Sequence, residues 1–279
     1  MKKSLKTLAV GIAVIPCAFA LTACGGNNHT LVDTTGSYST TSSYASMQEY
    51  VANNEATTEL NSYKMLINMD MSMSMMGMTV KTDSKTESII KLSADGSTLN
   101  MSLVSTNKAS GAGINENITT NLYIKDNYLT MNDGQGDWSH PYLLENFDQY
   151  TGSNLSMDQV FESFSANDLA GLNVKVDENE TTTKFKVTLD GSLLESFMEN
   201  SGALSEGLDI FGESSFSYGD AIIYYVFENG AFVGATMDME FNGSLSSEQG
   251  AMSFKCKIQF EFAQYEGDIV FPTDIPVIG

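Results

Sequence analysis

The sequence has 279 residues, with 14 basic residues against 35 acidic ones, and its formal net charge is −21. The chain is strongly acidic and contains no arginine. Because binding to phosphate groups requires clustered cations, it is a poor partner for nucleic acid and for anionic lipid headgroups. We interpret the acidity as a source of solubility.

The first 23 residues have the pattern of a secretory signal peptide. A charged start, "MKKSLK", precedes an apolar run from Leu8 to Leu21 that is too short to span a membrane comfortably. The next residues, "LTACG" at 21–25, resemble a bacterial lipobox, in which the cysteine thiol is acylated with diacylglycerol and the chain is cut before it. We therefore predict a signal peptide at 1–23 and lipidation at Cys24. Two or three acyl chains, such as palmitate, give stable anchoring, which would place the protein on the extracytoplasmic face of a bacterial cell membrane.

The predicted cleavage changes the charge and the cysteine content. Residues 1–23 hold three lysines and no acid, so the remaining chain carries 11 lysines and a net charge of −24. Cys17 leaves with the signal peptide and Cys24 is the anchor, which leaves Cys256 without an intrachain disulfide partner. Cys256 lies in the alternating segment "FKCKIQFEF", and this pattern predicts a buried, inert thiol rather than a nucleophile.

Residues 24–45 are predicted to be the lipidated cysteine and a flexible tether, because they are rich in Gly, Ser, Thr and Asn. We place the folded domain at 46–279. A Ser-x-x-Glu capping box at Ser46 predicts a helix to about Leu60, and related boxes at Ser156 and Ser192 predict two more short helices.

Nearly all the rest of the chain alternates with a period of two residues. In 63–75 the odd positions are apolar and mostly methionine, which predicts a strand, because helical spacing would scatter these side chains around the cylinder. The phase reverses after Met75, so a bulge or tight turn is expected there. Similar alternation at 99–103, 172–176, 185–189 and 233–241, with turn signals at 94–97, 125–127, 177–180 and 228–230, predicts about ten or eleven antiparallel strands. Residues 221–227, apolar on both faces, should form a central strand.

Such a sheet has more apolar surface than the helices can cover. The strand at 63–75 alone spans about 40 Å, whereas a ten-residue helix covers about 15 Å. The predicted fold class is therefore α+β, mainly antiparallel β, with a curved half-barrel sheet and a few short helices on its concave side. An apolar groove or cavity would remain open to a ligand.

The order of these features resembles the LolA-like lipoproteins, in particular a little-characterised group on Gram-positive surfaces. The resemblance covers about residues 46–276 and includes "LNSYKMLINMDMSMSM", the hairpin "NLYIKDNYLTMN" followed by "DW", and "YYVFENGAFVGATMDMEF" before a last strand leading to "FP". It implies a half-barrel closed by helices around an apolar cavity, as in the mycobacterial lipid-binding (LppX/LprG-type) lipoproteins. Periplasmic LolA carriers use an arginine at the cavity mouth, which this chain lacks.

We therefore expect a non-enzymatic lipoprotein without a cofactor that binds a lipid or acyl chain. The expected cavity residues share the apolar face of the strands: Met65, Met69, Met71, Met73, Met101 and Met237. A Cu(I)-binding lipoprotein is one alternative, since thioethers select Cu(I), although same-face methionines on a strand lie about 7 Å apart. A structural or adhesive surface module without a small ligand is another.

Candidates for catalysis and metal binding are weak in this sequence. His140, the only histidine in the predicted domain, has no Gly-x-Ser-x-Gly nucleophile elbow to pair with. Residues 132–138 lack the ligand spacing of a calcium loop. We therefore predict no catalytic residue and no metal ligand.

Overall fold

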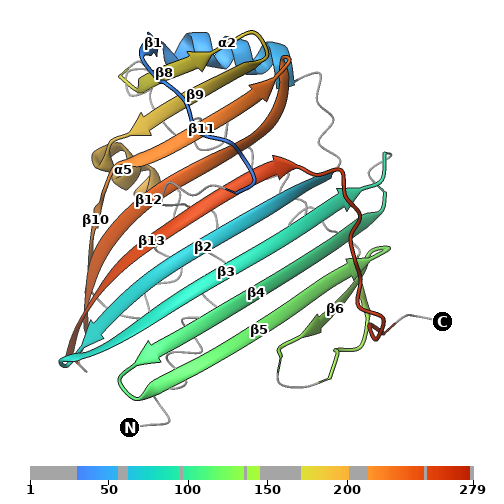
Figure 1. The fold of residues 1–279 in the computed structure, drawn as a ribbon. Helices are drawn as coiled ribbons and strands as arrows, with labels where there is room; N and C mark the ends of the chain where they lie inside the picture. The colour runs from blue at the N-terminus through green and yellow to red at the C-terminus, as the bar shows by residue number, and fades with distance from the viewer. Residues whose placement is uncertain are drawn as a thin grey trace.

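The computed structural model describes residues 30–55, 62–94, 97–134, 137–144, 171–200, 213–247 and 250–276. Within these residues one antiparallel sheet of 13 strands carries two short helices, α2 (Tyr44–Glu55) and α5 (Gly191–Asn200) (Figure 1). This confirms the predicted fold class. The signal peptide, Cys24 and the helix expected after Ser156 lie outside the described residues.

The sheet consists of two meanders that meet at a central seam. The strands are β1 (Thr40–Ser42), β2 (Ser62–Met75), β3 (Met78–Leu92), β4 (Leu99–Gly111), β5 (Ile114–Lys125), β6 (Tyr128–Asn132), β7 (Tyr142–Leu143), β8 (Asn173–Glu178), β9 (Thr182–Leu189), β10 (Glu213–Tyr218), β11 (Ala221–Glu228), β12 (Ala231–Ser247) and β13 (Gly250–Gln264). Strands β2 to β7 pair in chain order, and β8 to β13 form the other half. The last strand, β13, pairs with the first long strand, β2, and joins the halves. The strand at 63–75 and the central strand at 221–227 are confirmed as β2 and β11.

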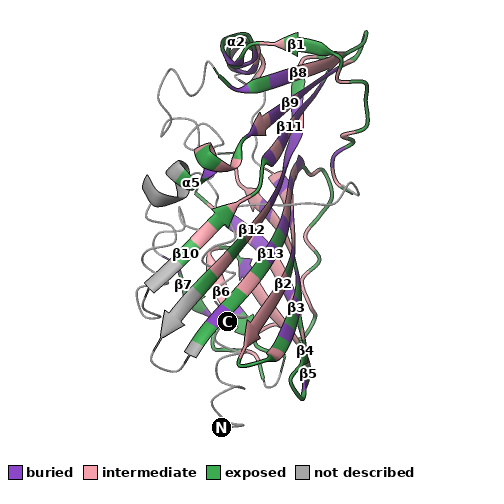
Figure 2. Cartoon of the chain, turned by 90° about the vertical axis from the view of Figure 1, so that its left-hand side faces the viewer, coloured by how far each residue is buried: buried purple, intermediate pink, exposed green. Residues whose placement is uncertain are grey.

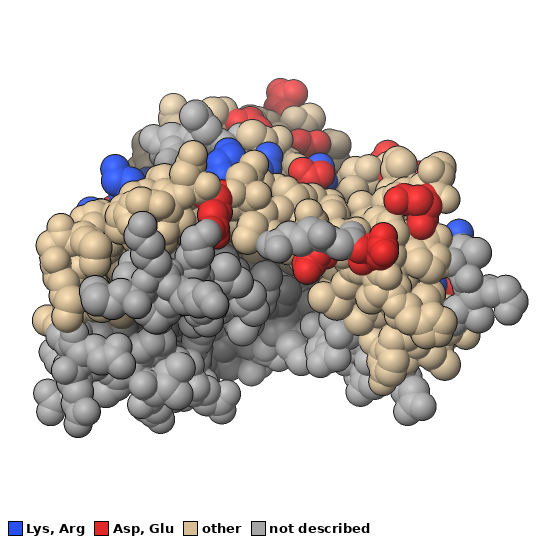
Figure 3. Space-filling model, turned by 90° about the horizontal axis from the view of Figure 1, so that it is seen from below, with Lys and Arg blue, Asp and Glu red and all other residues tan. Residues whose placement is uncertain are grey.

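One face of the sheet runs continuously across both halves. A row of directly opposite residues passes from Phe185 through Tyr225, Ala235 and Phe262 to Met65. Helix α2 packs on this face, since the ring of Tyr50 lies 5.3 Å from that of Phe185. We call this the inner face and the opposite one the outer face. The sheet curves around the inner face, and its outer face is convex (Figures 2 and 3).

Both described helices begin one or two residues before their predicted caps. The hydroxyl of Ser43 accepts the amide of Ser46 at 3.1 Å, so Ser43 rather than Ser46 caps α2. The carboxylate of Asp190 accepts the amides of Ser192 and Leu193, both at 3.0 Å, so Asp190 rather than Ser192 caps α5. The predictions failed because several capping residue types follow one another, and the pattern Ser-x-x-Glu does not choose among them.

Part of the segment expected to be a flexible tether, from Thr30 onward, is hydrogen-bonded to the sheet. We call residues 30–39 the N-terminal strap, because they cross the outer face of the upper strands before β1 (Figure 1). The amides of Thr30 and Leu31 donate to Oε2 of Glu261 at 2.7 and 2.6 Å. The ammonium group of Lys184 donates to the carboxylate of Asp33 at 2.7 Å. Composition alone favoured disorder here and could not reveal these distant partners.

Tight turns fix the register of the hairpins. Met76 and Gly77 connect β2 to β3 with φ angles of 52° and 76°, which is the two-residue turn type that matches strand twist. This turn accounts for the phase reversal that the sequence shows after Met75. Positive φ angles at 126–127 and 229–230 confirm two more predicted turns.

The sheet departs from the prediction in strand number and in one register. The count exceeds the expected ten or eleven, partly because β1 and β7 at the two edges are too short to show alternation. Val233, expected to alternate with Ala235, lies where the register between β11 and β12 shifts. It packs instead with Val32 of the strap and Val226.

Candidate apolar site on the inner face

Methionine side chains of β2 form a column beside an aromatic and aliphatic column of β13. Met65 lies opposite Phe262, and Met73 lies opposite Phe254. Between them, Met69 is opposite Ile258 and Met71 is opposite Cys256; Met69, Cys256 and Ile258 form one buried cluster. Thioethers pack adaptably and contact ring edges favourably, so this seam is a soft apolar surface.

The six methionines expected to line a cavity fall into two groups. Met101 and Met237 are almost fully buried, with exposed fractions of 4% and 3%; Met237 belongs to the core cluster that includes helix residues. Met69 is also buried. Met65, Met71 and Met73 are half-buried and lie on the same inner column. The structure therefore brings the four β2 methionines together and separates Met101 and Met237 from them by intervening strands.

Charge is distributed asymmetrically between the two faces. Every lysine after Cys24 occupies a strand position on the outer face: Lys64, Lys81, Lys85, Lys91, Lys108, Lys125, Lys175, Lys184, Lys186, Lys255 and Lys257. Several pair with acids there, such as Lys64 with Glu87 at 2.9 Å. Figure 3 shows this mixture of charges along the convex side. At inner positions of the described strands β2–β5 and β11–β13, Glu116 is the one charged side chain.

A polar band interrupts the apolar inner face, and the sequence analysis missed it. We call it the hydroxyl strip; it consists of Thr82, Ser84, Thr86 and Ser88 on β3 with Ser105 and Asn107 on β4. Because β3 is polar on both faces, its sequence resembles a solvated strand, and only its pairing with β2 shows that these hydroxyls lie on the inner face. Ser84 donates to the side-chain carbonyl of Asn107 at 2.6 Å, and the hydroxyls of Thr86 and Ser105 are 2.9 Å apart.

At one end of this strip, two buried hydroxyls have no hydrogen-bond partner in the described structure. They are the hydroxyl of Ser88, a residue with an exposed fraction of 2%, and that of Tyr63, with 4%. Burial raises the pKa of the Tyr63 phenol, so the group stays neutral and keeps its proton as a donor. Buried polar groups normally have a partner, so these two are unusual.

The chemistry of Cys256 agrees with the predicted inert thiol. The residue is buried, and burial raises the pKa of its thiol to about 12, with a smaller contribution from Asp70. Since the thiolate is the reactive form, Cys256 is not a nucleophile near neutral pH.

Other kinds of site are not apparent in the described part of the chain. It contains no cluster of three or more His, Cys, Asp or Glu side chains suited to a metal ion. His140 is exposed in the connection between β6 and β7. No described helix is long and apolar enough to cross a membrane.

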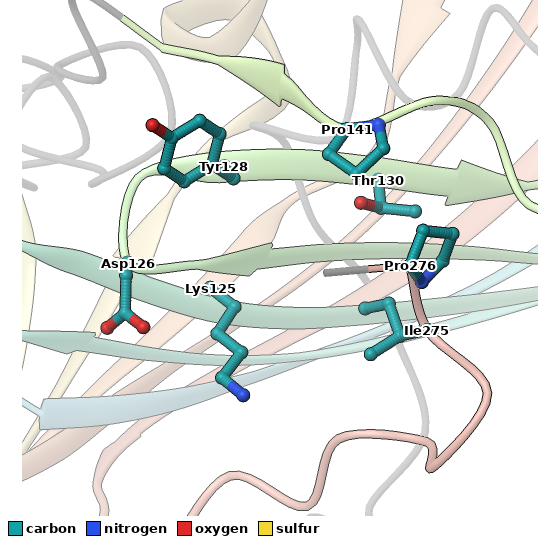
Figure 4. A pocket seen from close by; sticks show the side chains of 7 residues that line it. All are labelled: Lys125, Asp126, Tyr128, Thr130, Pro141, Ile275 and Pro276. Carbon is teal, nitrogen blue, oxygen red and sulfur yellow. The ribbon is translucent and has the colours of Figure 1, made fainter. Parts of the chain in front are cut away.

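A separate cavity of about 260 Å³ lies on the outer face, where the C-terminal segment crosses the β5–β6 hairpin. Figure 4 shows Ile275 and Pro276 of that segment beside Thr130 and Pro141. The segment is held by a hydrogen bond of 3.0 Å from the indole of Trp138 to Asp274. The volume is below that of common ligand pockets, about 300–1,000 Å³, and is small for an acyl lipid.

Comparisons with known proteins find likeness in structure only. No known protein family matches the sequence, and neither does any functionally curated protein. LprF from Mycobacterium bovis is 11% identical with a TM-score of 0.32, and the match covers 83% of this chain and 98% of that one. A DUF1329 family protein from Desulfovibrio piger is 9% identical with a TM-score of 0.23, covering 81% and 95% of the two chains. A β-barrel-like DUF1849 protein from Brucella abortus is 7% identical with a TM-score of 0.20, covering 75% and 100%. At these scores the likenesses carry no argument about function.

Proposed function

We propose that the protein is a lipid-anchored, extracytoplasmic, non-enzymatic lipoprotein that binds the acyl chain of a lipid or lipoprotein on the inner face of its half-barrel. The observation that carries the proposal is the separation of charge: the described long strands place every lysine outside, while the inner seam is built from methionine, phenylalanine and isoleucine. Contiguous apolar surface of this kind is typical of sites for hydrophobic ligands.

The half-buried methionines suit such a ligand physically. Met65, Met71 and Met73 retain exposed surface beside the fully packed clusters. Their unbranched side chains adapt to chains of different length and unsaturation, as at promiscuous binding surfaces. Burial of each methylene of an acyl chain contributes about 0.8 kcal/mol, so a chain lying along part of β2 would bind stably.

The anchor and location belong to the same proposal. The lipobox around Cys24 and the resemblance to LolA-like lipoproteins support an extracytoplasmic position at the membrane. Only five residues, 25–29, lie between Cys24 and Thr30, which is bound to the sheet. At about 3.5 Å per extended residue, that linker spans about 20 Å. The half-barrel would therefore lie close to the membrane surface, within reach of lipid.

The experiment compares two substitutions at neighbouring positions of β2. Met71→Asp places a charge on the inner face, and Ser72→Asp places the same charge on the outer face. Binding of an uncharged probe, the methyl ester of a pyrene-labelled fatty acid, is measured by fluorescence for wild type and both variants, with circular dichroism and thermal unfolding as checks of folding. We expect at least a tenfold loss of affinity for Met71→Asp and wild-type affinity for Ser72→Asp. A wild-type protein without affinity for the probe, or a folded Met71→Asp variant with full affinity, would exclude the proposal.

A further inference from the structure

The hydroxyl strip lies directly against the methionine column. Across the β2–β3 pair, Ser88 is opposite Met65 and Ser84 is opposite Met69. Directly opposite side chains in an antiparallel pair have Cβ atoms about 5 Å apart. An apolar surface and a hydrogen-bonding surface therefore adjoin from the Met65–Ser88 pair to the Met71–Thr82 pair of β2 and β3. This arrangement matches the two parts of an amphiphile.

The strip is an incomplete hydrogen-bond network. Within it, Ser84 bonds to Asn107, and Thr86 bonds to Ser105. At the end near Tyr63, however, the buried hydroxyls of Ser88 and Tyr63 have no partner in the described structure. Because buried polar groups are nearly always satisfied, this end has donors and acceptors left for a ligand.

In the described part of the sheet, the inner strand positions next to these hydroxyls hold no charged side chain. No lysine occupies an inner strand position, and Glu116 lies toward the far end of β5, opposite Ala109. A phosphate or ammonium headgroup would lose its hydration here without gaining a counterion, whereas a hydroxyl or ester group would regain hydrogen bonds.

We propose that the hydroxyl strip, with the unpartnered hydroxyls of Ser88 and Tyr63 at one end, binds the uncharged, hydrogen-bonding head of an amphiphile whose acyl chain lies on the methionine column. The inference rests on the proposed function and specifies its ligand class. The ligands that fit are diacylated lipids with a hydroxyl, ester or sugar head and no phosphate. Anionic phospholipids are rejected for lack of a cation.

The test uses the full chain in neutral detergent micelles and three competitors with identical dioleoyl chains. Dioleoylglycerol, its monoglucosyl derivative and dioleoyl phosphatidylglycerol are each tested for displacement of the pyrene-labelled methyl ester. The two uncharged lipids are expected to compete at least tenfold better than the phosphatidylglycerol. The first two lipids share both ester groups, but the free glycerol hydroxyl of the first carries glucose in the second. Their comparison therefore separates recognition of the glycerol hydroxyl and esters from recognition of the sugar.

Two substitutions at neighbouring positions of β4 provide a matched control. Ser105→Ala removes an inner hydroxyl bonded to Thr86, whereas Thr106→Val removes an outer hydroxyl bonded to Thr119 at 3.2 Å. Ser88→Ala removes the unpartnered hydroxyl itself. We expect Ser88→Ala and Ser105→Ala to weaken the uncharged lipids at least fivefold with a smaller loss of affinity for the methyl-ester probe, and Thr106→Val to change neither.

The outcomes separate this inference from the proposed function. If the probe binds but all three lipids compete equally, the hydroxyl strip does not recognise the head and acyl binding stands. The same conclusion follows if Ser88→Ala and Ser105→Ala have no effect. Absence of probe binding by the wild-type protein overturns the proposed function, and this inference with it. Preference for the phosphatidylglycerol overturns the assignment of an uncharged head.

Discussion

Met71 on β2 and Cys256 on β13 are direct partners across the seam of the sheet. The pair places a thioether beside a thiol, which sequence spacing could not show, since the two residues are far apart along the chain. It is the arrangement most favourable to the copper alternative. The thiol is held protonated by burial, with a pKa of about 12, and this opposes its use as a soft-metal ligand.

We predict that replacing both Met71 and Met73 with leucine leaves the affinity for Cu(I) unchanged, because leucine keeps the apolar volume and these methionines serve packing. The double variant should also retain acyl-probe binding within threefold. Competition with a chromogenic Cu(I) chelator measures the first quantity. Tight wild-type binding that disappears in the double variant would replace the lipid proposal with copper binding.

Cys256 provides a second prediction, on reactivity. At pH 8 the folded protein should not react with Ellman's reagent at this residue, since both burial and the raised thiol pKa disfavour the thiolate. Unfolding in guanidinium chloride should expose it at once. Rapid reaction without denaturant would show that the seam opens frequently.

The ion pair between Lys184 and Asp33 makes stability depend on pH. The hydrogen bond from Lys184, aided by those from Thr35, lowers the pKa of the Asp33 carboxyl to about 2. A depressed folded pKa contributes stability above the unfolded value, near 3.8, and the contribution is lost as the pH falls toward 2. Since Asp33 is largely exposed, solvent screening limits the contribution to about 0.5–1 kcal/mol.

Accordingly, Asp33→Asn should lower the free energy of unfolding at pH 7 by about that amount and match wild type near pH 2. Urea unfolding at the two pH values measures the difference. An equal deficit at both would mean that packing of the strap, rather than charge, is affected.

Glu261 should be the stronger attachment of the strap. Its side chain is fully buried, and Oε2 accepts two backbone amides. Hydrogen bonds to a charged acceptor contribute about 1.5–3 kcal/mol each. Burial of Oε1 without a hydrogen-bond partner in the described structure offsets part of this contribution. Glu261→Ala should therefore lower the free energy of unfolding by about 2–4 kcal/mol and expose residues 30–39 to proteolysis. The exposed Glu228→Ala, also on the outer face, serves as control. An undigested strap in Glu261→Ala would show that Val32 and its apolar neighbours hold the strap without the carboxylate.

The cap of α5 can be tested by a pair of substitutions. Asp190→Ala should lower the free energy of unfolding by about 1 kcal/mol, because it removes the acceptor for two helix amides. These bonds also lower the pKa of Asp190, so the effect should diminish in acid. Ser192→Ala should have a smaller effect, since the Ser192 hydroxyl only donates to Asp190. Equal losses, measured by thermal unfolding, would refute this assignment.

The sequence predicted those features that depend on local pattern. Alternation along 63–75 placed β2 correctly, and the turn residues at 126–127 and 229–230 placed two hairpins. Features that depend on distant partners were missed. The strap is held by Glu261 and Lys184, which are far away in the sequence. The inner position of Ser84 and Ser88 follows only from the pairing of β3 with β2. The methionine column could be predicted from the sequence of β2 alone. Its aromatic neighbours on β13 could not, because they depend on the pairing of β13 with β2.

The central claim is that the inner face holds an acyl lipid, and native mass spectrometry of the full chain purified from membranes in mild detergent tests it most directly. The account predicts a non-covalent complex with one diacylated lipid per chain, which organic extraction releases, beyond the mass of the covalent anchor. A spectrum containing only the bare lipoprotein, with no lipid in the extract, would contradict it.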